Sequence, residues 1–314
     1  MKDNIRELLN ELYPVDIVQV LPVTDEMYRC EGKEGTYYAR ITNYKTYQEQ
    51  LEEIRWTDYL HQQGLSVSPT IASRNGKPIE QIKLDGVKLV VLYEAAPGVH
   101  PPKSLWKASL LKELGRQIGK LHRLSKAYQK EEKVVHIKEW HQNEEYNFLK
   151  YIPKEQTKIR RIAEEVLIAV KNLPKNDTAY GLIHGDLWLE NILVDPLSKL
   201  TMVDFQDCEK HYLMFDLAVP IYSAVEYSFD GNGNITDYAR SVTDAILNGY
   251  REEHHLSEEM LKTLPLLIKL KEIFEYSLMY MYWDPANLTE DQLRIMNHCR
   301  LRIEGNHGIL EKEG

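Results

Sequence analysis

The chain has 314 residues, of which 43% are hydrophobic, so it can form a core and is not a disordered protein. Its 39 Lys and Arg residues against 48 Asp and Glu give a net charge of −9. This argues against a nucleic-acid partner, which needs clustered positive charge. Three distant cysteines, a charged N-terminal segment and the lack of a long apolar run predict a reduced, cytoplasmic protein without a membrane span.

Most of the strand signal lies in the first 95 residues. Apolar residues at helical spacing predict a helix over residues 5–12, and residues 16–43, with two runs rich in β-branched and aromatic side chains, predict three short strands. A second helix is expected over residues 46–64, where Gly64 ends it. Further strands follow, with a hairpin turn at Asp85–Gly86.

From Lys103 onward the pattern changes, and apolar residues recur at helical spacing. Strands that cluster first and helices that follow favour an α+β protein with two lobes over an alternating doubly wound sheet. We predict that residues 1–95 form a small lobe, with an antiparallel sheet and one helix. Residues 96–314 should form a larger, mostly helical lobe.

One island of strand signal interrupts the helical half. Residues 192–204 predict a hairpin, preceded by the stretch HGDLWLEN at residues 184–191. A hairpin returns the chain, so Asn191 before it and Asp204 at its end can converge, with Asp186 close by. Two hard oxygen ligands suit Mg²⁺ that carries substrate phosphates. A separate carboxylate suits a base that orients a hydroxyl nucleophile.

This stretch, continued as TMVDFQDCEKHYLMFDLA, resembles the catalytic segment of the aminoglycoside phosphotransferase and choline kinase family. The resemblance covers nearly the whole chain, including LVVLYEAAPG and LGRQIGKLHRLS. It implies a two-lobe, protein-kinase-like fold that uses ATP and Mg²⁺. It also implies that Asp186 is the catalytic base, Asn191 a metal ligand and Asp204 the main metal ligand. In the same family pattern His184 braces the loop, and Asp216 anchors it through backbone N–H groups.

Two departures from protein kinases affect the function expected. Gly185 stands where protein kinases have an arginine that reads a phosphorylated activation loop, so we expect activity without activation by phosphorylation. Asp207, in DFQD, adds a carboxylate that could touch a second Mg²⁺ or the acceptor, or could be an ordinary solvated turn acid.

The resemblance also indicates the ATP side. Arg40 in the third strand matches a basic residue that faces the α- and β-phosphates, to which an arginine can bind in bidentate fashion. Its partner acid should come from the following helix, and we expect Glu53, with Glu49 and Glu52 as alternatives. The backbone near Tyr93 and Ala95, in the segment that resembles the hinge between lobes, should bind the adenine edge.

The residues that would bind the phosphate acceptor are predicted from a weaker pattern. One helical face in KEIFEYSLMYMYWD combines an acid with aromatic rings, which suits an ammonium group but is also common in a core helix. The residues of that face are Glu272, Tyr276, Tyr280 and Trp283.

We therefore predict a monomeric or homodimeric kinase of a small, amine-bearing alcohol, such as an aminoglycoside, choline, ethanolamine, homoserine or a hydroxy amino acid. A protein Ser/Thr kinase and a catalytically silent, nucleotide-binding relative are the alternatives.

Overall fold

The computed structural model of the chain describes residues 2–84, 86–229, 234–305 and 308–310. It confirms an α+β protein with an antiparallel sheet in the N-terminal part and helices in the C-terminal part. In the described residues, no helix is both long and apolar enough to cross a bilayer. Asp85 of the predicted hairpin turn lies outside the described residues.

The chain forms two compact units. The first, called the sheet unit, consists of residues 1–100, 128–137 and 192–206. The second, called the helical unit, consists of residues 101–127, 138–191 and 207–314. Because two later segments belong to the sheet unit, a division into residues 1–95 and 96–314 follows the order of the chain but not the composition of the units.

The sheet unit is built on an antiparallel sheet whose strand order is β1-β2-β3-β6-β4, with β5 also paired to β6. The strands are β1 (Ile17–Pro22), β2 (Met27–Gly32), β3 (Thr36–Thr42), β4 (Thr70–Ile71), β5 (Glu80–Lys83) and β6 (Val87–Glu94). In the register of the central pair, Arg40 of β3 lies opposite Val91 of β6. The pairing therefore places Arg40 in the middle of the sheet.

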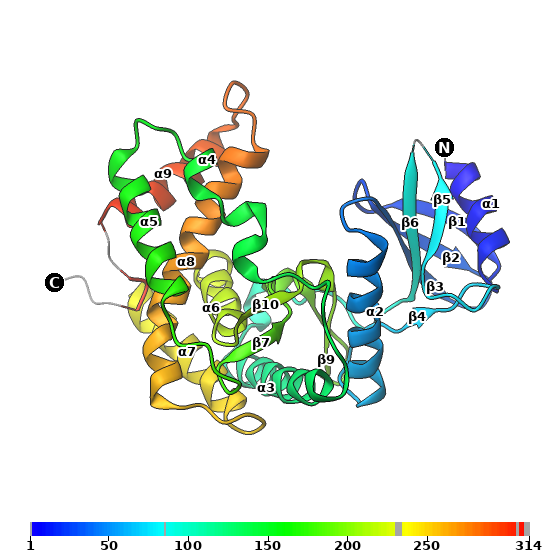
Figure 1. Ribbon diagram of the computed structural model, residues 1–314, viewed down its shortest axis with the longest axis horizontal. Coiled ribbons are helices and arrows are strands. Elements are labelled where there is room, and N and C mark those ends of the chain that lie inside the picture. Colours follow the sequence, from blue (N-terminus) through cyan, green and yellow to red (C-terminus); the bar gives the residue numbers. More distant parts are fainter. Residues whose placement is uncertain (1, 85, 230–233, 306–307, 311–314) are drawn as a thin grey trace. The chain divides into compact units, whose positions relative to one another are not determined.

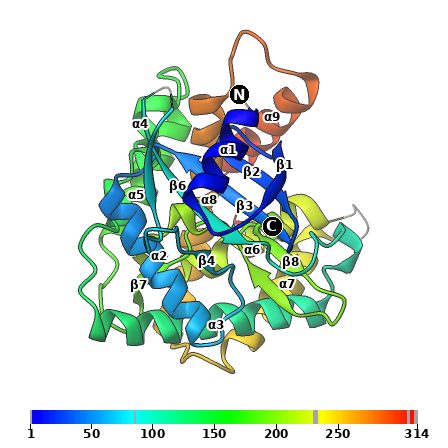
Figure 2. The same cartoon turned by 90° about the vertical axis from the view of Figure 1, so that its right-hand side faces the viewer.

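Two helices cover this sheet, α1 (Lys2–Leu12) and α2 (Tyr47–Gln62). Both segments were predicted as helices, although the lobe as a whole was expected to contain one. Successive side chains of a strand point to opposite faces, and β6 uses both. Val90 and Leu92 pack in the cluster that contains Leu9 of α1. Val91 packs with Ile54 of α2. Figures 1 and 2 show the two helices on the two faces, so Arg40 lies on a strand that is buried on both sides.

The predicted hairpin over residues 192–204 is present in the sheet unit. Its strands are β8 (Ile192–Val194) and β9 (Leu200–Met202), paired antiparallel. Met202 bridges to Val67, and Val194 bridges to Val99, so both strands join segments from the first part of the chain. Gly98, with a φ of 101°, lies so close to Val194 that a Cβ would be 2.5 Å from its carbonyl carbon. The hairpin is thereby fixed to the end of the sheet segment.

The helical unit contains a short strand pair, β7 (Tyr180–Ile183) with β10 (Glu209–Tyr212). Its α-helices are α3 (Ala108–Glu131), α4 (Phe148–Tyr151), α5 (Thr157–Lys171), α6 (Phe215–Ser228), α7 (Ile235–Tyr250), α8 (Glu258–Tyr282) and α9 (Glu290–Gly305). The last residues of α3, from 128 on, are assigned to the sheet unit. The described residues also form short 3₁₀ turns, η1 (Lys103–Leu105), η2 (Trp140–Gln142), η3 (Glu144–Tyr146), η4 (Leu189–Asn191) and η5 (Phe205–Asp207).

Helices α3 and α7 approach each other closely at two glycines. A Cβ on Gly115 of α3 would lie 1.9 Å from the carbonyl oxygen of Ile246, and one on Gly249 of α7 would lie 1.7 Å from that of Lys112. The clashing atoms belong to the backbone, so a change of side-chain rotamer cannot relieve the clash. The contact brings together His122 and Tyr250, which belong to the network described below.

Gly115→Ala should lower the free energy of unfolding of the helical unit by about 1–3 kcal/mol, because the added methyl forces the two helices apart. Chemical denaturation followed by circular dichroism measures the change. Gly35→Ala is the matched control, since a Cβ there meets no atom within 4 Å. Equal stability of the two variants would contradict the helix contact.

Candidate active site

The stretch HGDLWLEN follows β7 and is held by a carboxylate at the first turn of α6. Asp216 is fully buried, and it accepts hydrogen bonds from the backbone N–H groups of His184 (2.8 Å) and Gly185 (2.9 Å). The side chain of His122 in α3 lies 3.0 Å from the same carboxylate, and its other ring nitrogen lies 2.9 Å from the hydroxyl of Tyr250. Asp216 thus binds the loop backbone, as the family pattern implied.

Two residues shape the loop between this anchor and Asp186. Gly185 has a φ of +87°, and a Cβ there would lie 2.4 Å from the carbonyl oxygen of Asp207. Only glycine fits this conformation and this approach. The ring of His184 is buried, and its Nδ1 lies 3.3 Å from the backbone nitrogen of Asp186. His184 therefore braces the loop from within.

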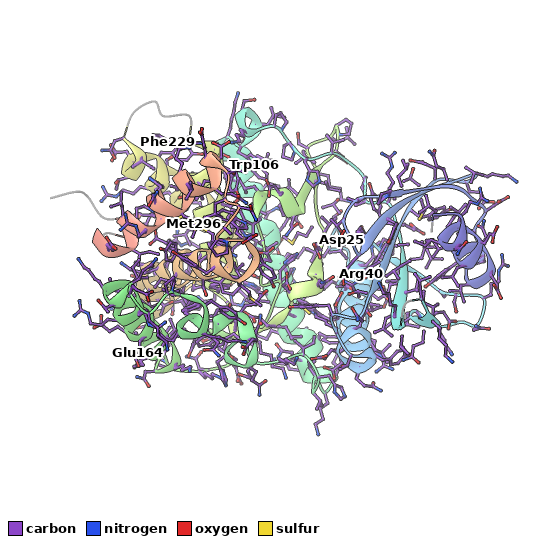
Figure 3. The ribbon with its side chains drawn as sticks, turned by 90° about the horizontal axis from the view of Figure 1, so that it is seen from above. Asp25, Arg40, Trp106, Glu164, Phe229 and Met296 are labelled. Atoms are coloured by element: carbon purple, nitrogen blue, oxygen red, sulfur yellow. The ribbon has the colours of Figure 1, made fainter. Side chains whose placement is uncertain are left out.

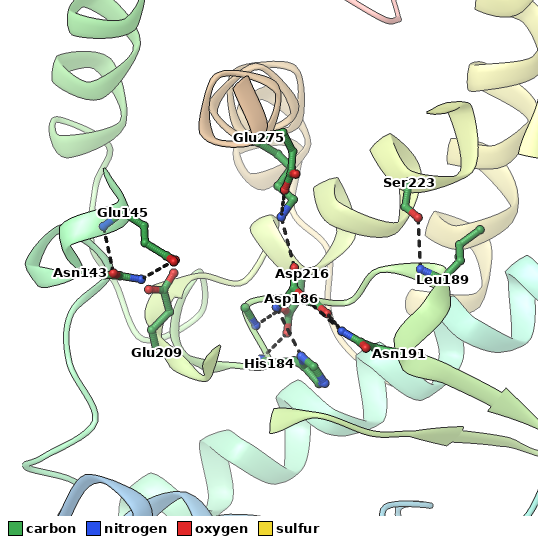
Figure 4. A network of polar contacts seen from close by, with 12 residues as sticks. Asn143, Glu145, His184, Asp186, Leu189, Asn191, Glu209, Asp216, Ser223 and Glu275 are labelled. Atoms are coloured by element: carbon green, nitrogen blue, oxygen red, sulfur yellow. Dashed lines mark hydrogen bonds and ion pairs between the residues drawn. The ribbon is translucent and has the colours of Figure 1, made fainter. Parts of the chain in front are cut away.

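Asp186 projects from the loop with a partner on each carboxylate oxygen. Oδ2 accepts a hydrogen bond from Nδ2 of Asn191 (3.2 Å), and Oδ1 lies 3.2 Å from Nζ of Lys271. The same Asn191 Nδ2 donates to the backbone carbonyl of Asp186 (2.7 Å). Figure 4 shows Asn191 and Glu275, the second partner of Lys271, on different sides of Asp186. The carboxylate is 30% exposed, so it is oriented by these contacts and still accessible.

Further carboxylates lie near Asp186 in the helical unit. The pKa of Glu275 is raised, first by burial, although Lys271 opposes the shift, and the charges of Asp186 and Glu145 raise it further. The pKa of Glu209 is raised well above its usual value, mainly by burial. Glu209 accepts a hydrogen bond from the Tyr146 hydroxyl (2.9 Å). Lys271 pairs with both Asp186 and Glu275, so one buried cation faces two acids here.

In the sheet unit, Arg40 forms the ion pair predicted for it. Its Nη2 lies 2.7 Å from Oε1 of Glu53, and both side chains are at most 3% exposed (Figure 3 labels Arg40). Lys45 contacts the other oxygen of Glu53 at 3.2 Å. Burial opposes the charge of Arg40, but Glu53, Tyr93 and Asp204 leave its pKa above the usual value. Asp204 is thus close enough to Arg40 for their charges to interact.

The two alternative partners of Arg40 have other contacts. Glu49 completes the capping box of α2 with Thr46. Glu52 accepts hydrogen bonds from three consecutive backbone N–H groups, those of Val135, His136 and Ile137, at 2.6–3.1 Å. A carboxylate that accepts several N–H groups forms strong, charge-assisted bonds. Glu52 therefore fixes the outer face of α2 to the segment 128–137, while Glu53 faces the sheet.

The segment predicted to bind adenine is partly occupied by sheet contacts. The backbone N–H of Ala95 donates to the carbonyl of Thr36 (3.1 Å), which leaves its carbonyl oxygen for the predicted contact. Tyr93 pairs with Tyr38 of β3 and with Thr70 of β4, so its backbone lies within the sheet. Its ring lies 5.6 Å from the guanidinium carbon of Arg40. Tyr93 contributes a side chain to the surroundings of Arg40.

Asp204 and Asp207 end the hairpin region in different units. Asp204 is exposed and has a φ of +63°, a left-handed conformation that is uncommon outside glycine and that aspartate tolerates. Such strained backbone clusters at functional sites. Asp207 belongs to the helical unit, where its carbonyl approaches Gly185 and its charge raises the pKa of Glu209. Among the described residues no three acids, histidines or cysteines gather into a cluster able to hold a metal by themselves.

The face of α8 predicted for the acceptor does not meet Asp186. One residue along a helix turns the side chain by about 100°. Lys271 points to Asp186, whereas Glu272 is 2% exposed and pairs with Arg302 at 2.6 Å. Tyr276 and Tyr280 bond to Gln156. With Trp283 they line a pocket of about 230 Å³ between α8 and α9. Glu272 is therefore buried in an ion pair, and the acceptor role of this face stays a prediction.

The sequence profile of the phosphotransferase enzyme family matches residues 20–251, about three-quarters of the chain. The chain belongs to this family. The family predicted from the motif around Asp186 is thereby confirmed, and the chain is a small-molecule kinase.

Two named relatives match over most of their length. Amicoumacin kinase of Bacillus subtilis (strain 168) is 28% identical over 287 residues, which cover 90% of this chain and 85% of that protein. Homoserine kinase of Zymomonas mobilis is 26% identical over 277 residues, which cover 84% and 82% of the two chains.

Among solved structures, an amicoumacin kinase in complex with AMP-PNP and Ca²⁺ is similar with a TM-score of 0.91 and 26% identity, covering 99% of this chain and 95% of that one. All three are named as kinases of small molecules, so the alternative of a protein kinase receives no support from them.

Sequence reasoning missed His122 and Lys271, two residues of the network around Asp186. His122 lies within LGRQIGKLHRLS, which was used for the resemblance, but a histidine in an apolar helix does not reveal its buried partner. Lys271 is adjacent to a residue that was chosen, and only its contact with Asp186, 85 positions away, identifies it. Glu52 was weighed as a partner of Arg40, and its bonds to residues 135–137 depend on a distant segment.

Arg40→Ala should lower the free energy of unfolding of the sheet unit by about 3–5 kcal/mol, because it leaves the buried Glu53 with Lys45 alone. Urea unfolding monitored by circular dichroism measures this change, and Arg161→Ala serves as the control because its pair with Glu165 is exposed. The double variant Arg40→Ala/Glu53→Ala should lose less than the sum of the single changes. Additive losses would show that the two side chains do not interact.

Proposed function

We propose that the chain transfers the γ-phosphate of ATP to a hydroxyl of a small, amine-bearing molecule, with Asp186 as the base and Mg²⁺ as the metal. The observation that carries this proposal is the orientation and accessibility of the Asp186 carboxylate. Its carboxylate is oriented by Asn191 and Lys271, partly exposed, and mounted on a loop that the buried Asp216 holds. A base needs this combination of fixed orientation and access.

The reaction requires little covalent chemistry from the protein. The acceptor oxygen forms a bond to the γ-phosphorus, the bond from that phosphorus to the bridging oxygen breaks, and ADP leaves with the electron pair. The proton of the acceptor hydroxyl passes to the Asp186 carboxylate. The orientation of Asp186 therefore contributes to the rate by placing the proton acceptor in advance.

Asn191 and Asp204 are the residues proposed to hold Mg²⁺. Both offer the hard oxygen ligands that this ion prefers, and Mg²⁺ is usually bound by one or two such groups together with substrate phosphates. The amide of Asn191 uses Nδ2 toward Asp186, which fixes the direction of its oxygen. The carboxylate of Asp204 is exposed. When bound, the metal neutralises charge on the phosphates.

Arg40 is proposed to bind the α- and β-phosphates. Its partner Glu53 also contacts Lys45, so two cations share this acid, and Asp204 lies near Arg40 as a further acid. The adenine contact is proposed for the carbonyl oxygen of Ala95, with Tyr93 beside Arg40. ATP as the donor agrees with the AMP-PNP bound to the similar kinase structure.

An ammonium group on the acceptor is supported by the charges near Asp186. Lys271 is the cation among Asp186, Glu275 and Glu145, whose charges interact, and Glu145 also accepts a hydrogen bond from the Tyr282 hydroxyl (2.7 Å). Lys271, Glu275 and Tyr282 share one face of α8 by helical spacing. Homoserine, the substrate that names one relative, carries both an amine and a hydroxyl. Ethanolamine, choline, hydroxy amino acids and aminoglycosides carry the same combination or a quaternary equivalent.

Asp186→Asn should lower kcat about 10²–10⁴-fold and leave the Kd for ATP within about threefold, because the amide keeps the shape but cannot take the proton. Turnover is measured as ADP release with homoserine, ethanolamine, choline, serine and kanamycin as acceptors. Asp177→Asn, an exposed change in the same unit, is the control. Undiminished turnover by Asp186→Asn would refute the assignment of Asp186 as the base. If the unaltered chain binds nucleotide but transfers phosphate to none of these acceptors, it would be a catalytically silent relative.

Removal of divalent metal by EDTA should abolish turnover, and Mg²⁺ should restore it. Asp204→Asn should raise the Mg²⁺ concentration for half-maximal turnover at least about tenfold, because it removes a charged ligand. Asp244→Asn, exposed on α7, should leave that concentration unchanged. An unchanged Mg²⁺ requirement in Asp204→Asn would exclude Asp204 as a ligand.

A further inference from the structure

Lys271 lies in the middle of α8 and is 1% exposed, although lysine is almost never fully buried without a partner. Its Nζ lies 2.7 Å from Oε1 of Glu275, one helical turn on, and 3.2 Å from Oδ1 of Asp186. Burial favours the neutral amine, but the charges of Glu275 and Asp186 raise the pKa of Lys271 above its usual value. The group is therefore an ammonium ion.

Aromatic rings confine this ammonium further. Nζ lies 5.1 Å from the ring centroid of Trp188 and 4.9 Å from that of Phe274, within the range of cation–π attraction. Trp188 follows Asp186 by two positions in the same loop. Lys271 consequently touches the catalytic loop at two residues, while Glu275 and Phe274 hold it to α8.

These contacts determine the orientation of Asp186. A carboxylate bound at one oxygen can rotate about its χ2 angle, whereas one bound at both cannot do so without losing a partner. Asn191 binds Oδ2 from within the loop, and Lys271 binds Oδ1 from α8. The Asn191 contact moves with the loop, so Lys271 is the contact that ties the carboxylate to a rigid helix.

We propose that Lys271 is a positioning residue for phosphoryl transfer: its buried ammonium, anchored by Glu275, holds the Asp186 carboxylate in the orientation that receives the acceptor proton. This role rests on the function proposed for Asp186. Lys271 acts through Asp186 and transfers no proton itself. Its removal should therefore lower kcat and change the KM for ATP little.

A structural role as a buried counter-ion would also make Lys271 important, so the test separates charge balance from positioning. Lys271→Met leaves Asp186 and Glu275 without their cation and should lower the Tm. The double variant Lys271→Met/Glu275→Gln removes one positive and one negative charge. It should recover most of the lost Tm, because no uncompensated acid remains at position 275.

Positioning predicts that kcat does not recover with the Tm. Both variants should show a kcat lower by about 10²-fold, with the KM for ATP within about threefold of the unaltered chain. Turnover is followed as ADP release with whichever acceptor of the five-compound panel the unaltered chain phosphorylates fastest. Lys262→Met, on the same helix but exposed, is the matched control and should leave kcat and Tm unchanged.

The outcomes are distinct. Normal kcat in Lys271→Met, or recovery of kcat together with Tm in the double variant, would overturn the positioning role. Asp186→Asn is measured in parallel. If Asp186→Asn keeps the normal kcat, the proposed function of Asp186 fails. If Asp186→Asn loses turnover while Lys271→Met/Glu275→Gln keeps it, the proposed role of Asp186 stands and only the inference about Lys271 is refuted.

Discussion

The catalytic loop depends on one buried carboxylate. Asp216 has no exposed surface, and a charge in such a place is stable only when its oxygens are hydrogen-bonded. The backbone N–H groups of His184 and Gly185 and the ring of His122 supply these bonds. The chain therefore cannot move the loop away without leaving Asp216 unsatisfied. The position of Asp186, the next residue, follows from this constraint.

Each unit contains a buried charged side chain that pairs with two side chains of the opposite charge. The shared side chain is an acid in the sheet unit and a cation in the helical unit. In the sheet unit, one acid, Glu53, is shared by two cations, Arg40 and Lys45. In the helical unit, one cation, Lys271, is shared by two acids. The two proposed ligands, a nucleotide triphosphate and an amine-bearing acceptor, likewise carry opposite charges.

The sequence predicts best where function is local in the chain. Asp186 and Asn191 are five positions apart, and the sequence predicted that they lie close together, which their hydrogen bond bears out. Glu53 was expected as the partner of Arg40 on the family resemblance, with Glu49 and Glu52 as alternatives, and the ion pair is present. The acceptor face of α8 is harder to predict, because acids and aromatic rings occur on several faces of a core helix. A difference of one position, from Glu272 to Lys271, turns the side chain by about 100°. Only the tertiary contact with Asp186 distinguishes the two.

Gly185 shows how the anchor bears on regulation. For two consecutive N–H groups to reach one carboxylate, the backbone here takes a φ of +87°, and the carbonyl of Asp207 occupies the space of a Cβ. An arginine at this position would clash, so its absence is required by the loop itself. Where a regulated kinase orders its catalytic segment through a phosphate and an arginine, this chain holds the loop with Asp216, a residue of its own fold. The ordering contact is therefore part of the folded helical unit, and activity without activation by phosphorylation stays a prediction that this contact would explain.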